Sequence, residues 1–462
     1  MKNTIRKIAA LAAVSMLLGT AASCGKDNEE INDSQESTTE QNSSGKTEIT
    51  IGMPAFNNQF FPNISKFNGD SRDYIMKTVD YSKLVDDDED GSKAMHKLKM
   101  DLVSGSAPDI IILNSVDMMD FVNTGAFTDM YELMEQYDGV KKSDFLPNII
   151  KGFEVDGKIP ALSYGFFIET AASKTALVGD DKESWTPEEA MEAYDSMPED
   201  MRFCSNLSET ALADYMMKKS ADSSVDLANY TCNFTNGEFS RLLNFCRDNP
   251  VKAEYESDIG GESSYFSENQ LAILNDKQLV EEIEIRSFSQ SIGNVIWTNF
   301  GGEDITFVGY PSESGCGAVT SSLWMFGISD NCENKEAAWQ FINYMLSSSF
   351  QKSINESDSG LPVIQSILDY HLKNKDREDY RTIYYSRLYE GGIAPEGEYI
   401  TDEAVQKLYD YIMSVDFDPY CNFEIDNIIK EEYSAVISGE KTGEECADIL
   451  QSRISIYLSE KK

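Results

Sequence analysis

Two kinds of apolar spacing alternate along the first third of the folded region. Residues 48–53 alternate apolar and polar side chains as a strand does, and residues 110–113 form a continuous apolar run typical of a fully buried parallel strand. The stretch between them has apolar residues near one face of a helix: Met95, Leu98, Leu102 and Val103. This order of strand, helix and strand predicts an α/β lobe.

Further helices are predicted from their start signals and apolar stripes. Capping boxes, in which an N-cap side chain and the residue three positions later bond each other's backbone amides, are expected for Asp129 with Glu132, Thr186 with Glu189, and Thr442 with Glu445. Residues at helical spacing are Met130, Leu133, Met134 and Tyr137, then Ala338, Phe341, Ile342, Met345 and Leu346, and finally Leu450, Ile454, Tyr457 and Leu458. We expect these stripes to pack in the core.

Residues 1–46 carry targeting signals rather than fold signals. Basic residues precede an apolar run at 8–18, which is the layout of a secretory signal and is short for a membrane span. The run leads to Ala21-Ala22-Ser23-Cys24, which resembles a bacterial lipobox, although the usual leucine three residues before the cysteine is Ala21 here. We predict a signal peptide over 1–23, a lipid such as palmitate on Cys24, a flexible polar linker over 24–46, and a folded body from Thr47. The alternative is an ordinary secreted protein with a chance cysteine.

Length and charge restrict the remaining classes. A chain of 462 residues exceeds the usual size of one hydrophobic core, so two lobes are expected. With 39 basic and 80 acidic residues, the net charge of −41 argues against a nucleic-acid partner and against direct binding to anionic lipids. The acidity either keeps an extracellular protein soluble or attracts a cationic ligand.

The cysteines and histidines offer little material for a metal site. Seven cysteines follow Cys24, an odd number without metal-ligand spacing: Cys204, Cys232, Cys246, Cys316, Cys332, Cys421 and Cys446. We expect most of them to be small core residues, while some disulfide pairing stays open. The chain has two histidines, His96 and His371, and neither a metal nor a cofactor is expected.

Six short segments resemble the family 1 extracellular solute-binding proteins of bacteria, which include maltose-binding protein. In the family's order they are LVSGSAPDI (102–110), NTGAFTDM (123–130), DGKIPAL (156–162), FGGE to GYP (300–311), KEAAWQFI (335–342) and GLPV (360–363). Each motif is weak alone, but together they span nearly the whole folded body. The resemblance implies an α/β, two-lobe, periplasmic-binding-protein-like fold of type II, with an interlobe ligand cleft and a hinge. It places 47–167 and 306–348 in an N-terminal lobe, and 168–305 and 349–462 in a mostly helical C-terminal lobe.

The same resemblance implies a function. A protein of this kind captures a small ligand, here expected to be a carbohydrate or oligosaccharide, and delivers it to the permease subunits of an ABC transporter. We expect a non-enzymatic monomer on the outer face of the bacterial cytoplasmic membrane, which it contacts through the Cys24 lipid only.

Candidate ligand contacts combine flat aromatic rings with side chains that form hydrogen bonds, because sugar rings have apolar faces and polar edges. Those near strand ends and crossing segments are Phe56, Asn58, Phe60, Asn114, Tyr164, Phe166, Phe167, Trp297 and Trp324. Each aromatic ring could instead pack in the core, and Asn114 could cap a turn or helix. Trp185 and Trp339 are assigned to packing.

Two rival functions remain open. A surface glycan-active enzyme needs paired carboxylates, but among 80 acidic residues such a pair is uninformative, and no nucleophile elbow, zinc signature or phosphate loop is present. The second rival keeps the fold but binds a peptide, a polyamine or another cationic solute. A cleft with carboxylates beside aromatic rings would favour it.

Overall fold

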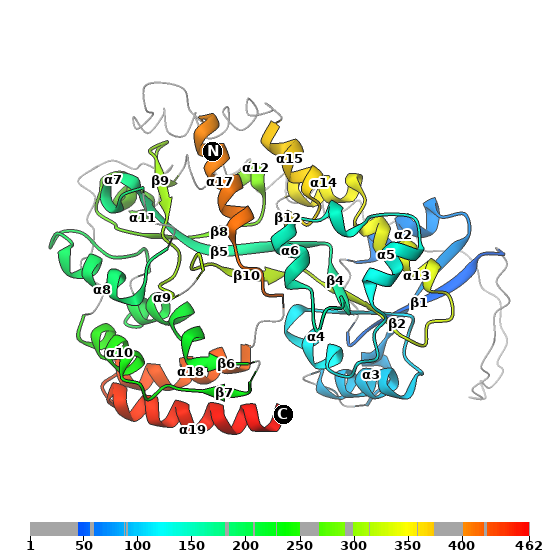
Figure 1. The fold of residues 1–462 in the computed structure, drawn as a ribbon, viewed down its shortest axis with the longest axis horizontal. Helices are drawn as coiled ribbons and strands as arrows, with labels where there is room; N and C mark the ends of the chain where they lie inside the picture. Colours follow the sequence, from blue (N-terminus) through cyan, green and yellow to red (C-terminus); the bar gives the residue numbers. More distant parts are fainter. Residues whose placement is uncertain are drawn as a thin grey trace, which may run out of the picture. The chain divides into compact units, whose positions relative to one another are not determined.

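The computed structural model describes residues 45–461, except for 56–59, 87, 89–90, 181–183, 207, 228, 250–267, 292–298, 314, 358, 374–400 and 420–422 (Figure 1). Residues 46–462 form one compact unit. Within the described part, no helix is both long and apolar enough to cross a membrane. The signal peptide, the Cys24 lipid and the linker lie outside the described residues.

The first sheet has five strands in the order β2-β1-β3-β11-β4. Their bounds are β1 (Thr47–Met53), β2 (Tyr74–Asp80), β3 (Ile110–Leu113), β4 (Ala161–Ser163) and β11 (Met325–Ile328). β1 is parallel to both β2 and β3, whereas β11 is antiparallel to β3 and β4. All four residues of β3 are buried, as predicted from its continuous apolar run.

Helices from the first half of the chain and one later helix share a buried apolar core with this sheet. They are α2 (Phe61–Asp70), α3 (Ser92–Ser104), α4 (Ser115–Val122), α5 (Met130–Gln136), α6 (Pro147–Gly152) and α13 (Lys335–Met345), with the short η2 (Tyr81–Lys83) and η3 (Lys142–Asp144). In α3 the prediction was wrong for Val103, which is 60% exposed. Leu98 and Leu102 are four residues apart and share the buried face, and Val103 is turned away from it by one residue's rotation.

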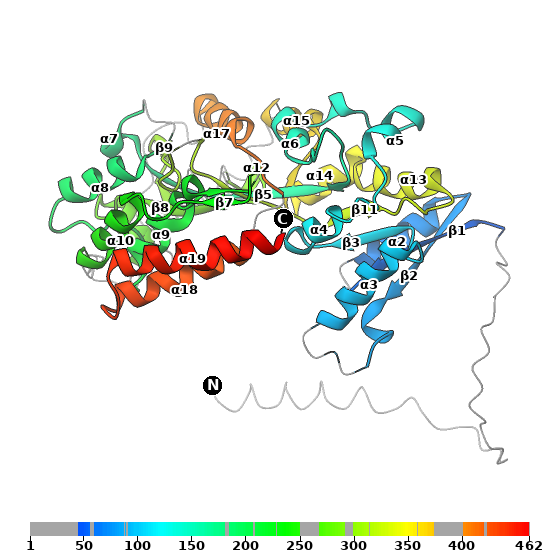
Figure 2. The same cartoon turned by 60° about the horizontal axis from the view of Figure 1, so that its bottom comes forward.

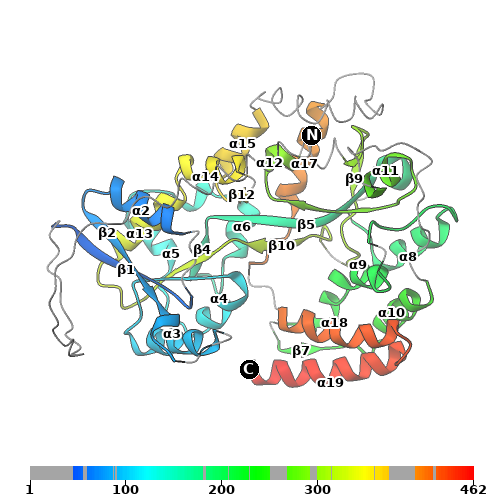
Figure 3. The same ribbon diagram turned by 180° about the vertical axis from the view of Figure 1, so that it is seen from behind.

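The second sheet is built on β5 (Gly165–Lys174), the longest of the described strands. Around it lie β8 (Glu281–Ile285), β9 (Ile305–Phe307), β10 (Val319–Ser322) and β12 (Leu361–Pro362), all antiparallel to β5. β5 follows β4 of the first sheet and β10 precedes β11, so these two neighbouring strands carry the chain between the sheets (Figure 3). Among the described strands, β10 has β5 as its one hydrogen-bonded neighbour, which leaves its outer edge open.

The remaining helices fall into two groups. One group consists of helices that contact one another near β12: α12 (Phe288–Ser291), α14 (Ser348–Glu356), α15 (Gln365–Lys373) and α17 (Asp402–Ser414). The others are α7 (Thr175–Val178), α8 (Pro187–Ser196), α9 (Ala211–Ser220), α10 (Glu238–Asp248), α11 (Glu268–Leu274), α18 (Phe423–Ile437) and α19 (Gly443–Lys461), with η4 (Asp222–Ser224) and the hairpin β6 (Val225–Asp226) and β7 (Thr231–Cys232). Helices α18 and α19 run side by side (Figures 1 and 2).

Two clusters of buried apolar side chains hold the described body together. The first core surrounds the first sheet and extends through α14, α15 and α17, and the second lies among α8, α9, α10, α18 and α19. Strand β5 contributes to both, with Ala172 in the first core and Ala171 in the second, because successive side chains point to opposite faces. Trp339 is fully buried in the first core and Trp185 in the second, which confirms their assignment to packing. The lobe boundaries given above remain a proposal.

Local signals in the sequence were mostly reliable. The capping boxes of Thr186 with Glu189 and of Thr442 with Glu445 both form. The third was wrong: Asp129 caps α5, but its carboxylate accepts from the amides of Tyr131 and Ile159 and has no reciprocal bond with Glu132. Of the six described cysteines, all are free and five are buried, as expected for core residues; Cys421 lies outside the described residues.

Candidate ligand pocket

Two of the predicted contact residues are buried in the first core. Phe60 meets Trp324 edge-on at 5.5 Å between ring centroids, and Phe166 meets Phe417 at 5.5 Å. Phe60 is 1% exposed and Phe166 is fully buried. In this conformation both rings act in packing and offer a ligand almost no surface.

Tyr164 and Trp324 are partly buried and lie opposite each other. The antiparallel register that pairs Met325 with Ser163 places these two residues across from one another, just beyond the ends of β11 and β4. Tyr164 packs against Phe350, and burial raises its pKa to about 12. Both rings retain some exposed surface where the chain leaves the first sheet. They remain candidates for stacking on a ligand.

The other predicted residues have different surroundings. Phe167 is partly buried on β5, with the Arg286 guanidinium 4.4 Å from its ring centroid. Asn114 is the N-cap of α4, where its side-chain oxygen accepts from the amide of Asp117 at 2.9 Å, so the capping alternative is confirmed. Phe56, Asn58 and Trp297 lie outside the described residues, as does Cys24.

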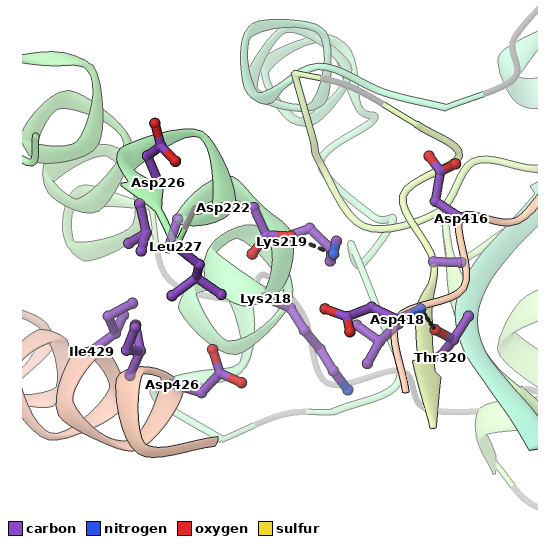
Figure 4. A pocket seen from close by; sticks show the side chains of 15 residues that line it. Lys218, Lys219, Asp222, Asp226, Leu227, Thr320, Asp416, Asp418, Asp426 and Ile429 are labelled. Atoms are coloured by element: carbon purple, nitrogen blue, oxygen red, sulfur yellow. Dashed lines mark hydrogen bonds and ion pairs between the residues drawn. The ribbon is translucent and has the colours of Figure 1, made fainter. Parts of the chain in front are cut away.

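Among the described residues, a pocket of about 490 Å³ lies at the open edge of β10 (Figure 4). Its walls come from the end of α9, from η4 and β6, from the start of α18, and from residues 416–418 between α17 and α18. The lining residues are Lys218, Lys219, Ala221, Asp222, Val225, Asp226, Leu227, Ala318, Val319, Thr320, Asp416, Asp418, Ile425, Asp426 and Ile429. None of the candidate contacts named from the sequence is among them.

The segment that joins α17 to α18 contributes two carboxylates through its alternating side chains. Phe417 points into the first core, where its ring meets Phe153 at 5.1 Å. Asp416 and Asp418, one residue to either side, are exposed and line the pocket. The backbone amide of Asp418 donates to the Thr320 hydroxyl at 3.0 Å, which fastens the segment to β10 (Figure 4).

Two lysines on the last turn of α9 already have carboxylate partners. Lys219 forms an ion pair with Asp222, drawn as a dashed line in Figure 4. Lys218 donates to Glu169 of β5 at 2.5 Å and lies 4.7 Å from the ring centroid of Tyr310. The positions of both ammonium groups are therefore set by the protein itself.

The electrostatic surroundings of the pocket are strongly negative. Desolvation and then the Asp222 carboxylate raise the pKa of Asp426 to about 6, although Lys219 and Lys218 oppose the shift. For Lys219, desolvation alone would lower the pKa, but Asp222, with help from Asp418 and Asp426, raises it above its ordinary value. The shift of Lys219 shows that the neighbouring carboxylates favour its positive charge.

Chemically, the pocket combines polar and apolar contacts of the kind that hold a small solute. Its aspartates accept hydrogen bonds, its lysines donate them, and Leu227, Ile425 and Ile429 provide apolar surface. In the described ranges, no three His, Cys, Asp or Glu side chains form a group that could hold a metal ion. Sequence reasoning missed this site because its residues come from five separate segments, and one aspartate among 80 acids carries no distinguishing signal.

A second hollow of about 460 Å³ lies between η3 and α6. Lys142 borders it, and its ammonium group pairs with Glu154 at 2.8 Å and sits 4.2 Å from the ring centroid of Tyr131. It is less strongly acidic than the β10 pocket, and neither β5 nor β10 lines it.

Comparison with known proteins identifies the fold. No protein-family model matches the chain, and no curated protein matches its sequence. Among solved structures, the sugar-binding protein MalE of Xanthomonas citri superposes with a TM-score of 0.57 at 13% identity, covering 90% of this chain and 98% of that one. A family 1 extracellular solute-binding protein of Alicyclobacillus acidocaldarius gives a TM-score of 0.54 at 12% identity, covering 90% of this chain and 100% of that one. The described body has the fold of extracellular solute-binding proteins.

That solute-binding fold is the two-lobe α/β class predicted from the motifs. A de novo designed cysteine esterase also shares it, with a TM-score of 0.56 at 14% identity over 90% of this chain and 99% of that one. The fold is therefore compatible with both binding and catalysis, and function has to be argued from the site.

Proposed function

We propose that this chain is an extracellular solute-binding lipoprotein that captures a small ligand, a carbohydrate or oligosaccharide, and delivers it to the permease of an ABC importer. The observation that carries this proposal is the pocket at β10 in a chain with the solute-binding fold. It lies on a strand that joins the two sheets and on the 416–418 segment, so a bound solute would contact parts of the chain that connect the two cores. Motion about such connections is how two-lobed binding proteins close.

The polar lining suits sugar hydroxyl groups. Carboxylates such as Asp418 accept hydrogen bonds from hydroxyls, and lysines such as Lys218 donate to ring and glycosidic oxygens. Trp324 follows Thr320 by four residues, a span of at most about 13 Å, and Tyr164 lies opposite Trp324. A solute as long as an oligosaccharide could contact the aspartates with one end and these rings with the other.

Anchoring completes the proposal. The N-terminal segment would be a signal peptide ending before Cys24, whose lipid would hold the protein at the outer face of the cytoplasmic membrane, with residues 25–46 as the tether. Mass spectrometry of the protein from a bacterial membrane fraction tests this step. An unmodified, freely secreted protein would contradict it.

Thermal shift of a chain beginning at residue 25 tests the capture of a solute, since residues 46–462 form a compact unit with their own cores. The panel contains neutral mono- and oligosaccharides, amino sugars, peptides and polyamines. A ligand at 100 times its Kd adds about 2.7 kcal/mol to stability, which for a body of this size raises Tm by about 3 °C. Turnover of a glycan, detected by chromatography of the same mixtures, would contradict a pure binding function.

A further inference from the structure

The charges around the pocket do not balance. Five aspartates and two lysines line it, and the partner of Lys218 is Glu169, a sixth carboxylate outside the lining set. Lys219 is paired with Asp222. Asp416 and Asp426 have neither an ion pair nor a side-chain hydrogen bond from another residue that the structure describes. A solute that enters the pocket therefore meets more carboxylate than the protein's own cations neutralise.

The proton equilibria respond to this excess. The pKa of Asp426 is raised to about 6, with desolvation and Asp222 as the leading causes, so part of this carboxylate's charge is suppressed near neutral pH. The pKa of Lys219 is raised despite its desolvation. Lys219 keeps its proton because Asp222, Asp418 and Asp426 outweigh its desolvation, which indicates a negative potential around its ammonium group.

We propose that the solute held in this pocket carries a protonated amine, which lies against Asp418 and Asp426 while Leu227 and Ile429 contact its carbon skeleton. The inference rests on the proposed function and specifies its ligand class. A protonated amine donates charge-assisted hydrogen bonds to carboxylates, and these are stronger than hydrogen bonds from neutral hydroxyls. Amino sugars and aliphatic polyamines share this chemistry.

An organic cation fits the geometry better than a bare ion does. The described carboxylates form no group of three that could hold a metal ion, so their charges are spread along the cavity wall. The walls also include five branched aliphatic side chains: Val225, Leu227, Val319, Ile425 and Ile429. Spread-out carboxylates with apolar surface between them suit a molecule that has both an ammonium group and carbon atoms to bury.

The amine should bind more weakly in acid. Protonation of Asp426 removes one of the two carboxylates that hold the ammonium group, so affinity should fall as the pH drops from 7.5 to 5. The charged groups that interact with Asp426 are Lys218 and Lys219 from α9, Asp222 from η4 and Asp418 from the 416–418 segment, and Asp226 and Asp416 line the same pocket.

The decisive experiment compares two ligands that differ chiefly in charge. Isothermal titration calorimetry of the chain from residue 25 would use a glucosamine trisaccharide and its fully N-acetylated, neutral counterpart, with spermidine as a cation that has no sugar ring. We expect the amine form to bind at least tenfold tighter than the acetylated form, and higher salt to weaken the amine alone. Spermidine then shows whether the sugar ring is needed.

Substitutions of the two aspartates test whether the amine binds in this pocket. Asp418→Asn and Asp426→Asn should each lower amine affinity about tenfold and leave the affinity for the acetylated sugar nearly unchanged. Asp426→Asn should also abolish the loss of affinity between pH 7.5 and 5. The matched control is Asp448→Asn, which removes the same charge from an exposed site on α19 outside the pocket.

The two proposals fail separately. Equal or tighter binding of the acetylated sugar overturns the amine inference but keeps carbohydrate capture. Amine binding that Asp418→Asn and Asp426→Asn do not weaken relative to Asp448→Asn overturns the assignment to this pocket. If only spermidine binds, the amine inference stands and the carbohydrate part of the proposed function falls. If no ligand of the panel binds, both proposals fall.

Discussion

Gly152, at the end of α6, lies directly against the backbone of the pocket's 416–418 segment. A Cβ atom added at Gly152 would stand 2.2 Å from the Phe417 carbonyl oxygen and 2.6 Å from a carbon of its ring. Both distances are far inside van der Waals contact, and the nearest atom is backbone, which cannot move aside by rotating a side chain. Gly152→Ala must therefore push residues 416–418 away from α6, or distort α6 itself.

The expected magnitude follows from that overlap. Overpacking a dense site by a methyl group typically costs about 1–3 kcal/mol. At about 2.1 cal/mol/K of unfolding entropy per residue, a body of this size should lose about 1–3 °C in Tm. Because Asp416 and Asp418 flank Phe417 and line the pocket, the same displacement should also lower the pocket's affinity for its solute.

Calorimetric unfolding and ligand titration of one purified variant measure both effects. Gly69→Ala is the matched control, since Gly69 also lies near the C-terminus of a helix and a Cβ there meets nothing within 4 Å. We expect that control to be neutral or more stable by about 0.4–1 kcal/mol, with unchanged binding. A Gly152→Ala protein with the stability and affinity of Gly69→Ala would refute the reasoning.

Three further outcomes are expected. Thr186→Ala, which breaks the box with Glu189, should cost about 1 kcal/mol in calorimetry, whereas Ser347→Ala, at an N-cap whose side chain makes no capping bond, should be nearly silent. Asp426→Asn should raise Tm at pH 7.5, because a carboxyl whose pKa in the folded protein is raised to about 6 destabilises the fold when it is ionised. This gain in Tm should shrink as the pH falls through 6 toward 4, where the wild-type carboxyl becomes protonated. A gain in Tm that stays constant over this range would contradict the raised pKa. Trp339→Ala should cost about 3–5 kcal/mol, since the ring is fully buried and its Nε1 donates to Asp138; a loss below 1 kcal/mol would contradict the packing role.

Local patterns in the sequence predicted most of the scaffold. The apolar run at 110–113 is a fully buried strand, and the Thr186 and Thr442 boxes start helices α8 and α19. Such features depend on residues a few positions apart, whose interactions are the same in any fold. Where the local signal was ambiguous, as for Asp129, the tertiary contact with Ile159 decided which amides the carboxylate bonds.

For the predicted ligand-contact residues, by contrast, local patterns could not decide between a role in packing and a role in binding. Alternation along β5 implies that Phe166 and Phe167 point to opposite faces, but it cannot say which face the core covers. The structure buries Phe166 against Phe417, a residue 251 positions away. Asn114 could equally have faced a ligand, and its use as a cap became evident only from the bond to Asp117.

The sequence by itself determined the alternation of strands and helices and several helix starts. It also gave rise to the expectation of a secretory N-terminal segment and, through six ordered motifs, of a solute-binding fold. Only the tertiary structure decided which aromatic rings are buried and where the charges gather. Capping and periodicity are short-range and repeat the same physics at each site, whereas a pocket forms where segments as distant as Lys218 and Asp426 converge. Its negative potential is a sum over those neighbours, and no single stretch of the chain contains it.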